Sequence, residues 1–332
     1  MLLDEVQLLE NFEFVLNGYL RHHNLDVYVT GSNSKFLSKD VITEFKSRGD
    51  EIHVLPLTFS EYVNGFNTSE HALWNEYTVF GGIPQVALMQ TDEQKTTYLK
   101  KLCQNLYISD IVERHNLKTD EEISDVFNII ASGIGSLVNP TKLSRTFLSV
   151  KNKELSSNTI SKYIEYLSDS FVISKSLRYD VKGKNYINTP YKLYFEDIGI
   201  RNVRIDFRQV EETHIMENII YNELRYRGYN VDVGVVEIRE SETKNGERIF
   251  KRTQTEVDFI ATLGSRKYYI QSALHMDTQE KIDQETKSLK NIDDSFKKII
   301  VVKDDIKPRQ DENGFMIMNI FDFLLNANSL NM

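Results

Sequence analysis

The pattern of hydrophobic and polar positions divides the chain into four parts with different predicted elements. The first part, residues 1–63, opens with a short apolar run and continues with helical apolar spacing over residues 6–23. Strand-like runs follow at Leu25–Thr30 and Ile52–Leu57. A helical crossover joins the opening run to Leu25–Thr30, so we expect these two strands to pair in parallel within an α/β sheet.

The next two parts, residues 64–135 and 136–205, differ in their periodicity. Residues 64–135 carry apolar positions at helical spacing, and Thr119 with Glu122 predicts a capping box before the last helix. Residues 136–205 read as two short helices around a turn, then two alternating strands joined by the loop Val181–Asn185. Helix, turn, helix and hairpin is the order of a winged helix-turn-helix.

The last part, residues 206–332, combines helices and strands in a compact α/β unit. A strongly amphipathic helix ends at Gly228, where glycine is typical of a helix C-terminus. The pattern after it predicts strands over 231–238, 256–263 and 267–274, a helix over 281–292 and a final strand over 297–304. The predicted fold class is therefore a multidomain α/β protein.

Composition supports a globular protein of the reducing cytosol. Of 332 residues, 40% are hydrophobic and 27% are charged, which is enough apolar material for several cores. The single cysteine, Cys103, excludes a disulfide framework and a Cys-based zinc site. We see no signal peptide and no apolar run approaching the ~20 residues of a membrane span, so we expect a cytoplasmic protein without membrane contact.

Charge is distributed unevenly along the chain. The net charge of −9 opposes nucleic-acid binding by the whole surface. Residues 141–184, however, contain nine Lys or Arg and four acids, a local excess of 9 − 4 = +5. Candidate DNA contacts are Lys162 on the second helix and Lys182 and Lys184 in the loop of the hairpin. The alternative is a winged helix that packs against protein, with these lysines simply solvated.

The first candidate chemistry lies at the end of the opening apolar run. A strand that ends in an acidic pair such as Asp4-Glu5 is how P-loop ATPases hold magnesium and orient the attacking water. The pair alone is weak evidence for such a site, because the tetrapeptide Leu-Leu-Asp-Glu also occurs by chance in helices. The strand Leu25–Thr30 leads into Gly31, Ser32 and Asn33, where such ATPases place a polar residue beside the γ-phosphate. A strand-ending turn is the alternative for these residues.

Four segments in a fixed order carry a resemblance that extends over the whole chain. They are DEVQLLENFEFVLNGYL, VTGSNSKFLS, FKSRGDEIHVLPLTFSEY and FGGIPQVAL. In this order they resemble the AAA-type predicted ATPases of bacteria and archaea, which combine a P-loop ATPase domain with a winged helix and a C-terminal domain of unknown function. The resemblance implies that Asp4 and Glu5 are the magnesium-holding and catalytic acids. It implies sensor positions at Ser32 and Asn33, and for Arg48 either contact with the γ-phosphate or the role of a solvated loop arginine.

The chain departs from this family at the phosphate-binding loop. No segment matches GxxxxGK[ST], and Gly81-Gly82 is followed by Ile83 and Pro84. Without a backbone cradle and a lysine on the phosphates, ATP binding loses its main contacts. We therefore expect an N-terminally shortened member, with residues 1–63 as an ATPase remnant and 64–135 as a lid-like helical segment. We expect no useful ATP affinity by itself; ATP, with Mg²⁺ on Asp4, belongs to a protein with the loop supplied.

The second candidate chemistry lies in residues 206–332. In the restriction-endonuclease-like fold, a helix Glu, a strand Asp and a Glu-x-Lys motif gather a divalent metal and activate water. The element order here resembles that fold, with Glu217 and Asp258 at the acidic positions and Glu223 farther along the helix. Gln271 replaces the third acid and Ala273 replaces the lysine. We expect a nuclease-like fold without nuclease chemistry, used for recognition or assembly.

Two hypotheses about function remain open at this point. The chain is either a shortened AAA-type ATPase relative with a degenerate nuclease-like domain, or a non-catalytic DNA- or protein-binding module in which the N-terminal part is a scaffold. Its expected partners are DNA, through the winged helix, and a protein or a second copy of the chain.

Overall fold

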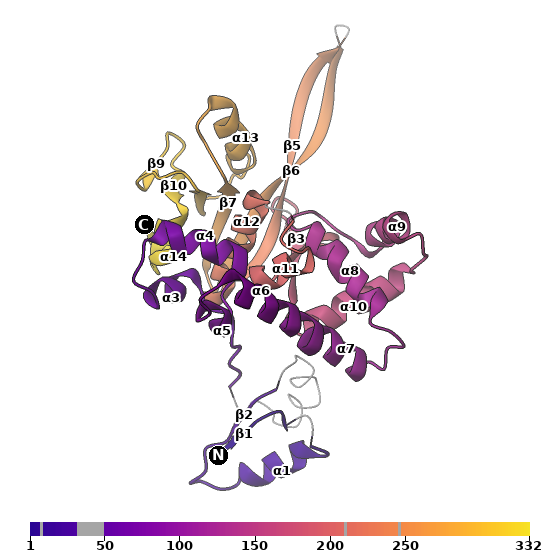
Figure 1. The fold of residues 1–332 in the computed structure, drawn as a ribbon. Coiled ribbons are helices and arrows are strands. Elements are labelled where there is room, and N and C mark those ends of the chain that lie inside the picture. Colours follow the sequence, from indigo (N-terminus) through magenta and orange to yellow (C-terminus); the bar gives the residue numbers. More distant parts are fainter. Residues whose placement is uncertain (7–8, 32–49, 209–210, 245–246) are drawn as a thin grey trace.

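The computed structural model describes residues 1–6, 9–31, 50–208, 211–244 and 247–332 (Figure 1). They form a small N-terminal unit with a two-stranded sheet and a larger body built around an eight-stranded sheet. The predicted mixed α/β architecture is confirmed. Within the described residues, every helix is too short or too polar to cross a lipid bilayer.

The N-terminal unit is a strand–helix–strand arrangement. Strand β1 (Leu2–Leu3) pairs in parallel with β2 (Tyr28–Val29), and α1 (Phe12–Tyr19) connects them. Phe12 and Leu16 of this helix pack with Val6 in a small separate core. The predicted parallel pairing across a helical crossover is confirmed, although the helix is shorter than its apolar pattern indicated.

The prediction of a third strand in this region, at Ile52–Leu57, is wrong. Residues 51–58 belong to no strand or helix. The side chains of Ile52 and Val54 are 80% and 85% exposed, so their β-branched pattern is not matched by burial. A β-propensity pattern predicts a strand only where a sheet neighbour and a packed face are present, and the described residues provide neither here.

The helical part follows the predicted periodicity with one interruption. Its helices are α3 (Phe59–Asn64), α4 (Glu70–Phe80), α5 (Pro84–Ala87), α6 (Asp92–Lys101), α7 (Ser109–Arg114) and α8 (Glu121–Ser132). A π-helical segment, Leu102–Ile108, joins α6 to α7. The predicted capping box of Thr119 and Glu122 is wrong, because α8 begins after Asp120 without a side-chain cap. The Glu122 carboxylate instead accepts a hydrogen bond from the Tyr163 hydroxyl at 3.0 Å.

Other helix starts are explained by side-chain caps. In α3, the Thr58 hydroxyl accepts the Glu61 amide at 3.2 Å and the Glu61 carboxylate accepts the Thr58 amide at 2.9 Å. In α9 (Pro140–Lys151), the Asn139 side chain accepts the Lys142 amide at 2.7 Å, and proline occupies the first helical position. These caps satisfy amides that have no partner within the helix.

Two helices and a hairpin follow in the order predicted for a winged helix. They are α9, α10 (Ser157–Asp169), β3 (Ile173–Asp180) and β4 (Asn185–Phe195). Val138, just before α9, bridges to Tyr191 of β4. Strand β3 also pairs in parallel with β5 (Asn230–Lys244), so the hairpin forms one margin of the large sheet. The winged-helix assignment and the four domain boundaries stay predictions.

The large sheet has the strand order β4-β3-β5-β6-β7-β8-β10-β9. Its remaining strands are β6 (Glu247–Leu263), β7 (Arg266–Ala273), β8 (Lys297–Val302), β9 (Arg309–Gln310) and β10 (Met316–Asn319), and the remaining helices are α11 (Ile198–Arg204), α12 (Glu212–Tyr226), α13 (Gln279–Lys290) and α14 (Ile320–Leu325). A 3₁₀ turn, Ser329–Asn331, ends the chain. The prediction that residues 297–304 form the final strand is wrong, because β9 and β10 follow.

Helices cover both faces of this sheet. Ile219 of α12 packs in one core with Phe259 and Ile270 of the sheet, and Leu289 of α13 packs in a second core with Ile260. The first core continues through the helical part as far as Phe59 of α3. There the ring of Phe321 from α14 lies 5.9 Å from the Phe59 ring. Elements near both ends of the body therefore share one core.

The FGGIP segment has a structural role in this body. The Gly82 amide donates to Asp197 Oδ2 at 2.7 Å, and the Gly82 carbonyl accepts the Leu57 amide at 2.8 Å. A Cβ on Gly82 would lie 2.2 Å from the Leu57 carbonyl oxygen, and Gly81 has a φ of +77°. Glycine is required at Gly82 because the backbone approach is so close, and at Gly81 because of its positive φ.

Candidate functional site

The N-terminal acidic pair lies where the two parallel strands end. Asp4 and Glu5 follow β1, and Thr30 follows β2. The Thr30 hydroxyl donates a hydrogen bond to the Asp4 carboxylate and accepts one from the Glu5 amide at 3.3 Å. Parallel strands place their carboxyl ends at one edge of the sheet, which explains why Thr30 meets the acidic pair.

Three other residues predicted for this site cannot be placed. Ser32, Asn33 and Arg48 lie outside the described residues. Their sensor and γ-phosphate roles therefore stay predictions. Thr30 was not predicted as a partner of Asp4; a polar residue at the end of the neighbouring strand was the available signal.

The second candidate site is a buried cluster around one lysine, which we call the Lys192 cluster. Lys192 Nζ lies 2.8 Å from Glu217 Oε1, 2.6 Å from Glu256 Oε1 and 3.7 Å from Asp258 Oδ1. The Tyr194 hydroxyl donates to the same Glu217 oxygen at 2.7 Å. Lys192 and Glu217 are 4% and 6% exposed, so these charges are removed from water.

A β-bulge directs Asp258 into the Lys192 cluster. The register pairs Asp232 with Ile260 but Gly234 with Val257, so β6 carries one extra residue at this point. Val257 packs on the α13 side of the sheet, whereas Asp258 meets Lys192 and Phe259 packs on the α12 side. An extra residue changes the alternation of a strand and lets it re-aim a side chain.

Burial and charge set the protonation of the Lys192 cluster. Burial opposes the charge on Lys192, but the three carboxylates outweigh it and raise the pKa of the ammonium. Burial also opposes the charge on Glu217, yet Lys192 and its hydrogen bonds lower the pKa of that carboxyl. Burial and the nearby charge of Glu217 together raise the pKa of Asp258. Lys192 and Glu217 therefore form the charged pair, and Asp258 is the carboxyl that takes up a proton first.

Two other residues of the predicted nuclease-like site lie away from this cluster. Gln271 donates from Nε2 to Glu285 of α13 at 3.1 Å, on the sheet face opposite to α12. Glu223 pairs with Arg227 at 2.7 Å instead of joining Glu217. The structure thus brings together Glu217 and Asp258 but not Gln271.

Sequence reasoning missed Lys192, Tyr194 and Glu256. The available signal was a lysine inside the apolar run Tyr191–Phe195, where every residue is buried. A buried lysine requires a carboxylate partner, so the sequence indicates an ion pair at this position but does not indicate which residue is the partner.

The Lys192 cluster does not fit a divalent metal. Mg²⁺ requires near-octahedral oxygen ligands, and a catalytic metal requires an open position for water. Here an ammonium lies between the carboxylates, and Asp258 Oδ2 accepts the Ser272 amide at 2.8 Å. Within the described residues no group of three or more His, Cys, Asp or Glu is arranged to hold a metal ion.

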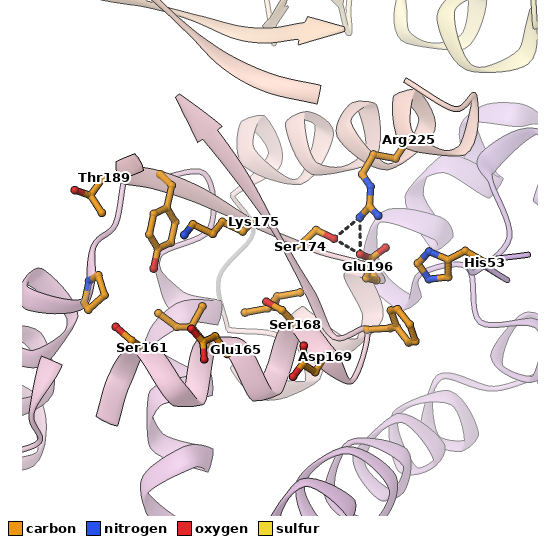
Figure 2. A pocket seen from close by; sticks show the side chains of 15 residues that line it. His53, Ser161, Glu165, Ser168, Asp169, Ser174, Lys175, Thr189, Glu196 and Arg225 are labelled. Atoms are coloured by element: carbon orange, nitrogen blue, oxygen red, sulfur yellow. Dashed lines mark hydrogen bonds and ion pairs between the residues drawn. The ribbon is translucent and has the colours of Figure 1, made fainter. Parts of the chain in front are cut away.

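A cleft of about 490 Å³ opens beside α10 and α12 (Figure 2). Arg225 Nη1 bonds to Glu196 Oε1 at 2.7 Å, and the Ser174 hydroxyl joins the same pair. Lys175 Nζ lies 4.0 Å from the centre of the Tyr191 ring. The cleft therefore contains both cations and carboxylates, and Arg225 and Glu196 are already paired with each other.

Comparisons with known proteins identify the family. An AAA domain matches residues 1–63, and a domain of unknown function (DUF8612) matches residues 71–211. An uncharacterized protein of Haemophilus influenzae is 31% identical over 329 residues, which are 98% of this chain and 77% of that protein. The chain belongs to this AAA-type, ATPase-like family.

Two further comparisons are less informative. An uncharacterized protein of Methanocaldococcus jannaschii is 29% identical over 292 residues, 84% of this chain and 62% of that protein. The crystal structure of protein VC1899 from Vibrio cholerae aligns with a TM-score of 0.23 and 10% identity over 96% of this chain and 70% of that one. This TM-score is too low to support a statement about the fold.

The predicted AAA-type membership is confirmed, and ATP with Mg²⁺ are the ligands that an AAA domain implies for the full-length family.

In this AAA-type family member, part of the basic excess of residues 141–184 is neutralised. Lys151 pairs with Asp125 at 2.5 Å and Lys153 pairs with Glu122 at 2.7 Å. Both acids lie on α8, outside the basic segment, so the excess falls from +5 to +5 − 2 = +3. The three candidate DNA contacts are exposed: Lys162, Lys182 and Lys184.

Proposed function

We propose that this AAA-type chain has a nuclease-like C-terminal region that does not cleave nucleic acid. The observation that carries the proposal is the position of Lys192 Nζ, 2.8 Å from Glu217 and 2.6 Å from Glu256. A positive charge fixed in the protein balances the carboxylates, which in a nuclease would balance a metal. The region then serves as a scaffold for recognition or assembly.

The chemistry of hydrolysis supports the same proposal. A metal-dependent nuclease needs a metal with an open position and a cation that polarises the attack. Gln271 is neutral and bonds to Glu285, and Ala273 offers no charge. Lys192 is held by carboxylates inside the protein and is 4% exposed, so it does not meet substrate.

We also propose that the residues present do not hold ATP by themselves. Asp4 already accepts a hydrogen bond from Thr30, and the printed sequence contains no GxxxxGK[ST] motif. Asp4 would hold Mg²⁺, and Glu5 would orient the attacking water, in an assembly that supplies a phosphate-binding loop.

The nuclease part is tested by incubating the full chain with supercoiled plasmid and Mg²⁺ or Mn²⁺. We expect no nicking above the level of the Asp258→Asn variant. Metal-dependent nicking that the variant loses would overturn the proposal. The nucleotide part is tested by titration with a fluorescent ATP analogue, where micromolar binding and Mg²⁺-dependent turnover would contradict it.

A second candidate function is contact with DNA through the predicted winged helix. It is favoured by the exposure of Lys162 on α10 and of Lys182 and Lys184 on the hairpin loop. A second helix laid in a groove and a loop on the phosphates would use these positions. Its test is DNA affinity of the Lys162→Ala variant, which we expect to weaken with a smaller dependence on salt.

A further inference from the structure

The cleft beside α10 and α12 has its walls on two separate elements (Figure 2). One wall is a flank of α10, where Ser161, Glu165 and Ser168 follow one another at helical spacing. The facing wall is the hairpin of β3 and β4, which contributes Lys175 and Tyr191. Both walls are regular elements, so the fold itself sets where these side chains lie.

The hairpin separates this cleft from the Lys192 cluster. The register pairs Lys175 with Leu193 and the next residue, Ser176, with Lys192. Successive residues of a strand point to opposite faces, so Lys175 and Lys192 lie on opposite faces of the hairpin. The cleft is therefore a site of its own.

The base of the cleft is apolar. Ile164, Ile173 and Tyr191 line it and are all buried. Phe171 and His53 also line the cleft, and the centres of their rings lie 4.5 Å apart. Small-molecule sites are commonly concave and apolar, with a few polar groups that fix the orientation of the ligand. The volume of about 490 Å³ is typical of such a site.

Two opposite charges at the cleft are left without an ionic partner. Within the described residues, neither Lys175 nor Glu165 forms an ion pair with the other or with a third group. Lys175 Nζ lies 4.0 Å from the centre of the Tyr191 ring, which holds the ammonium at the wall without neutralising it. Burial, and then the charge of Glu165, raise the pKa of Tyr191 to about 12. Both charges therefore lie near the same aromatic side chain.

The other charged groups of the cleft are engaged by the protein. Arg225 and Glu196 pair at 2.7 Å, and Asp169 also has an interaction within the chain. The hydroxyls of Ser168 and Thr189, by contrast, have no hydrogen-bond partner in the part of the chain that the structure describes. The cleft therefore offers a ligand one cation, one carboxylate and two hydroxyls above an apolar base.

We propose that this cleft binds a small zwitterion with an apolar side chain, either a free amino acid or a short peptide. The carboxylate of the ligand faces Lys175, its ammonium faces Glu165, and its side chain lies on Ile164 and Ile173. A ligand with a single charge leaves one of the two protein charges unpaired, and a phosphate-like anion is repelled by Glu165 as much as it is attracted by Lys175. Charge complementarity therefore selects a ligand that carries both signs.

The test uses the full chain and isothermal titration calorimetry with leucine and with the dipeptide leucyl-leucine. Leucinamide lacks the carboxylate and N-acetyl-leucine lacks the ammonium, so each removes one half of the proposed recognition. Lys175→Gln and Glu165→Gln remove the two protein charges. The matched controls are Lys162→Gln and Glu154→Gln, which each remove one exposed charge that does not line the cleft.

We expect submillimolar binding of at least one zwitterion by the wild type, and binding about tenfold weaker for each blocked ligand, because a charge-assisted hydrogen bond is lost. Binding of leucine itself indicates a free amino acid, and binding of leucyl-leucine alone indicates a peptide. Lys175→Gln should weaken the zwitterion about tenfold and leave leucinamide at its wild-type affinity. Glu165→Gln should weaken the zwitterion equally and leave N-acetyl-leucine unchanged.

Several outcomes would overturn the proposal. They are no binding of either zwitterion at about 10 mM, blocked ligands that bind as well as the zwitterions, and a Lys175→Gln variant that weakens leucinamide as much as leucine. Equal losses in the two control variants would also overturn it, because they would trace the effect to net charge. The comparison of ligands on the wild type needs no variant, so it decides the question even where a variant folds poorly.

Discussion

Replacement of Lys192 by methionine tests whether the Lys192 cluster is a closed ion-pair core. Methionine keeps much of the side-chain volume but removes the ammonium that Glu217, Glu256 and Asp258 share. Removing one partner of a buried ion pair costs about 3–5 kcal/mol, because the other charge is left buried without compensation. Asp258 has a raised pKa and can take up a proton, which relieves part of the repulsion. We therefore expect the lower end of that range, about 3 kcal/mol.

Urea unfolding followed by circular dichroism measures this loss as a lower midpoint with an unchanged slope. The matched control is Lys303→Met, which breaks a half-exposed pair with Glu212 and should lose less than about 1 kcal/mol. The double variant Lys192→Met with Glu217→Gln should recover part of the loss, because it leaves fewer buried charges. A Lys192→Met variant that loses no more than Lys303→Met would refute the reasoning.

Two further predictions concern the contacts of the FGGIP segment. Burial raises the pKa of Asp197 to about 6, against the opposing effect of hydrogen bonds from Gly82, Gly199 and Ile200. The contribution of the Asp197 carboxyl to the free energy of unfolding is fully present below the unfolded pKa of about 3.9 and is lost as the pH rises through 6, a change of about 3 kcal/mol. The urea midpoint of the wild type should fall over this pH range, and Asp197→Asn should remove that pH dependence. An Asp197→Asn variant with the same pH profile as the wild type would contradict this. Gly82→Ala should lower the free energy of unfolding by about 2–3 kcal/mol, because the alanine Cβ would lie 2.2 Å from the Leu57 carbonyl oxygen. Thermal unfolding measures this loss as a lower midpoint, and a midpoint equal to that of the wild type would disprove the clash.

Local patterns predicted the elements whose signals are local. The helices α9, α10 and α12 were predicted from their apolar spacing, whereas the Asn139 cap at the start of α9 was not predicted. The part of β5 after residue 238 and the part of β6 before residue 256 were missed, because the sequence there is mostly polar and shows no regular apolar alternation. The dipeptide Asn245-Gly246 between the two strands is the usual hairpin signal and was available in the sequence.

The Lys192 cluster was harder to predict, because its members come from distant strands and a helix. Glu217 and Asp258 were named as acids of a metal site, but the ammonium between them comes from Lys192 on the neighbouring hairpin. The bulge that re-aims Asp258 depends on the register with β5, which no single segment encodes. The position of Gln271 could not be predicted for the same reason. The predicted site placed its side chain on the α12 face of the sheet, whereas it lies on the α13 face and bonds to Glu285.

The contact between α3 and α14 has a consequence for the synthesis of this protein. Phe59 packs against Phe321, and 262 residues separate them in the chain. At about 5–20 residues per second, a ribosome needs roughly 13–50 s to make that interval. During this time the apolar faces of α3 and α4 lack their final cover. The contacts of Phe59 and Trp74 with Phe321 can therefore form only when synthesis of the chain is almost complete.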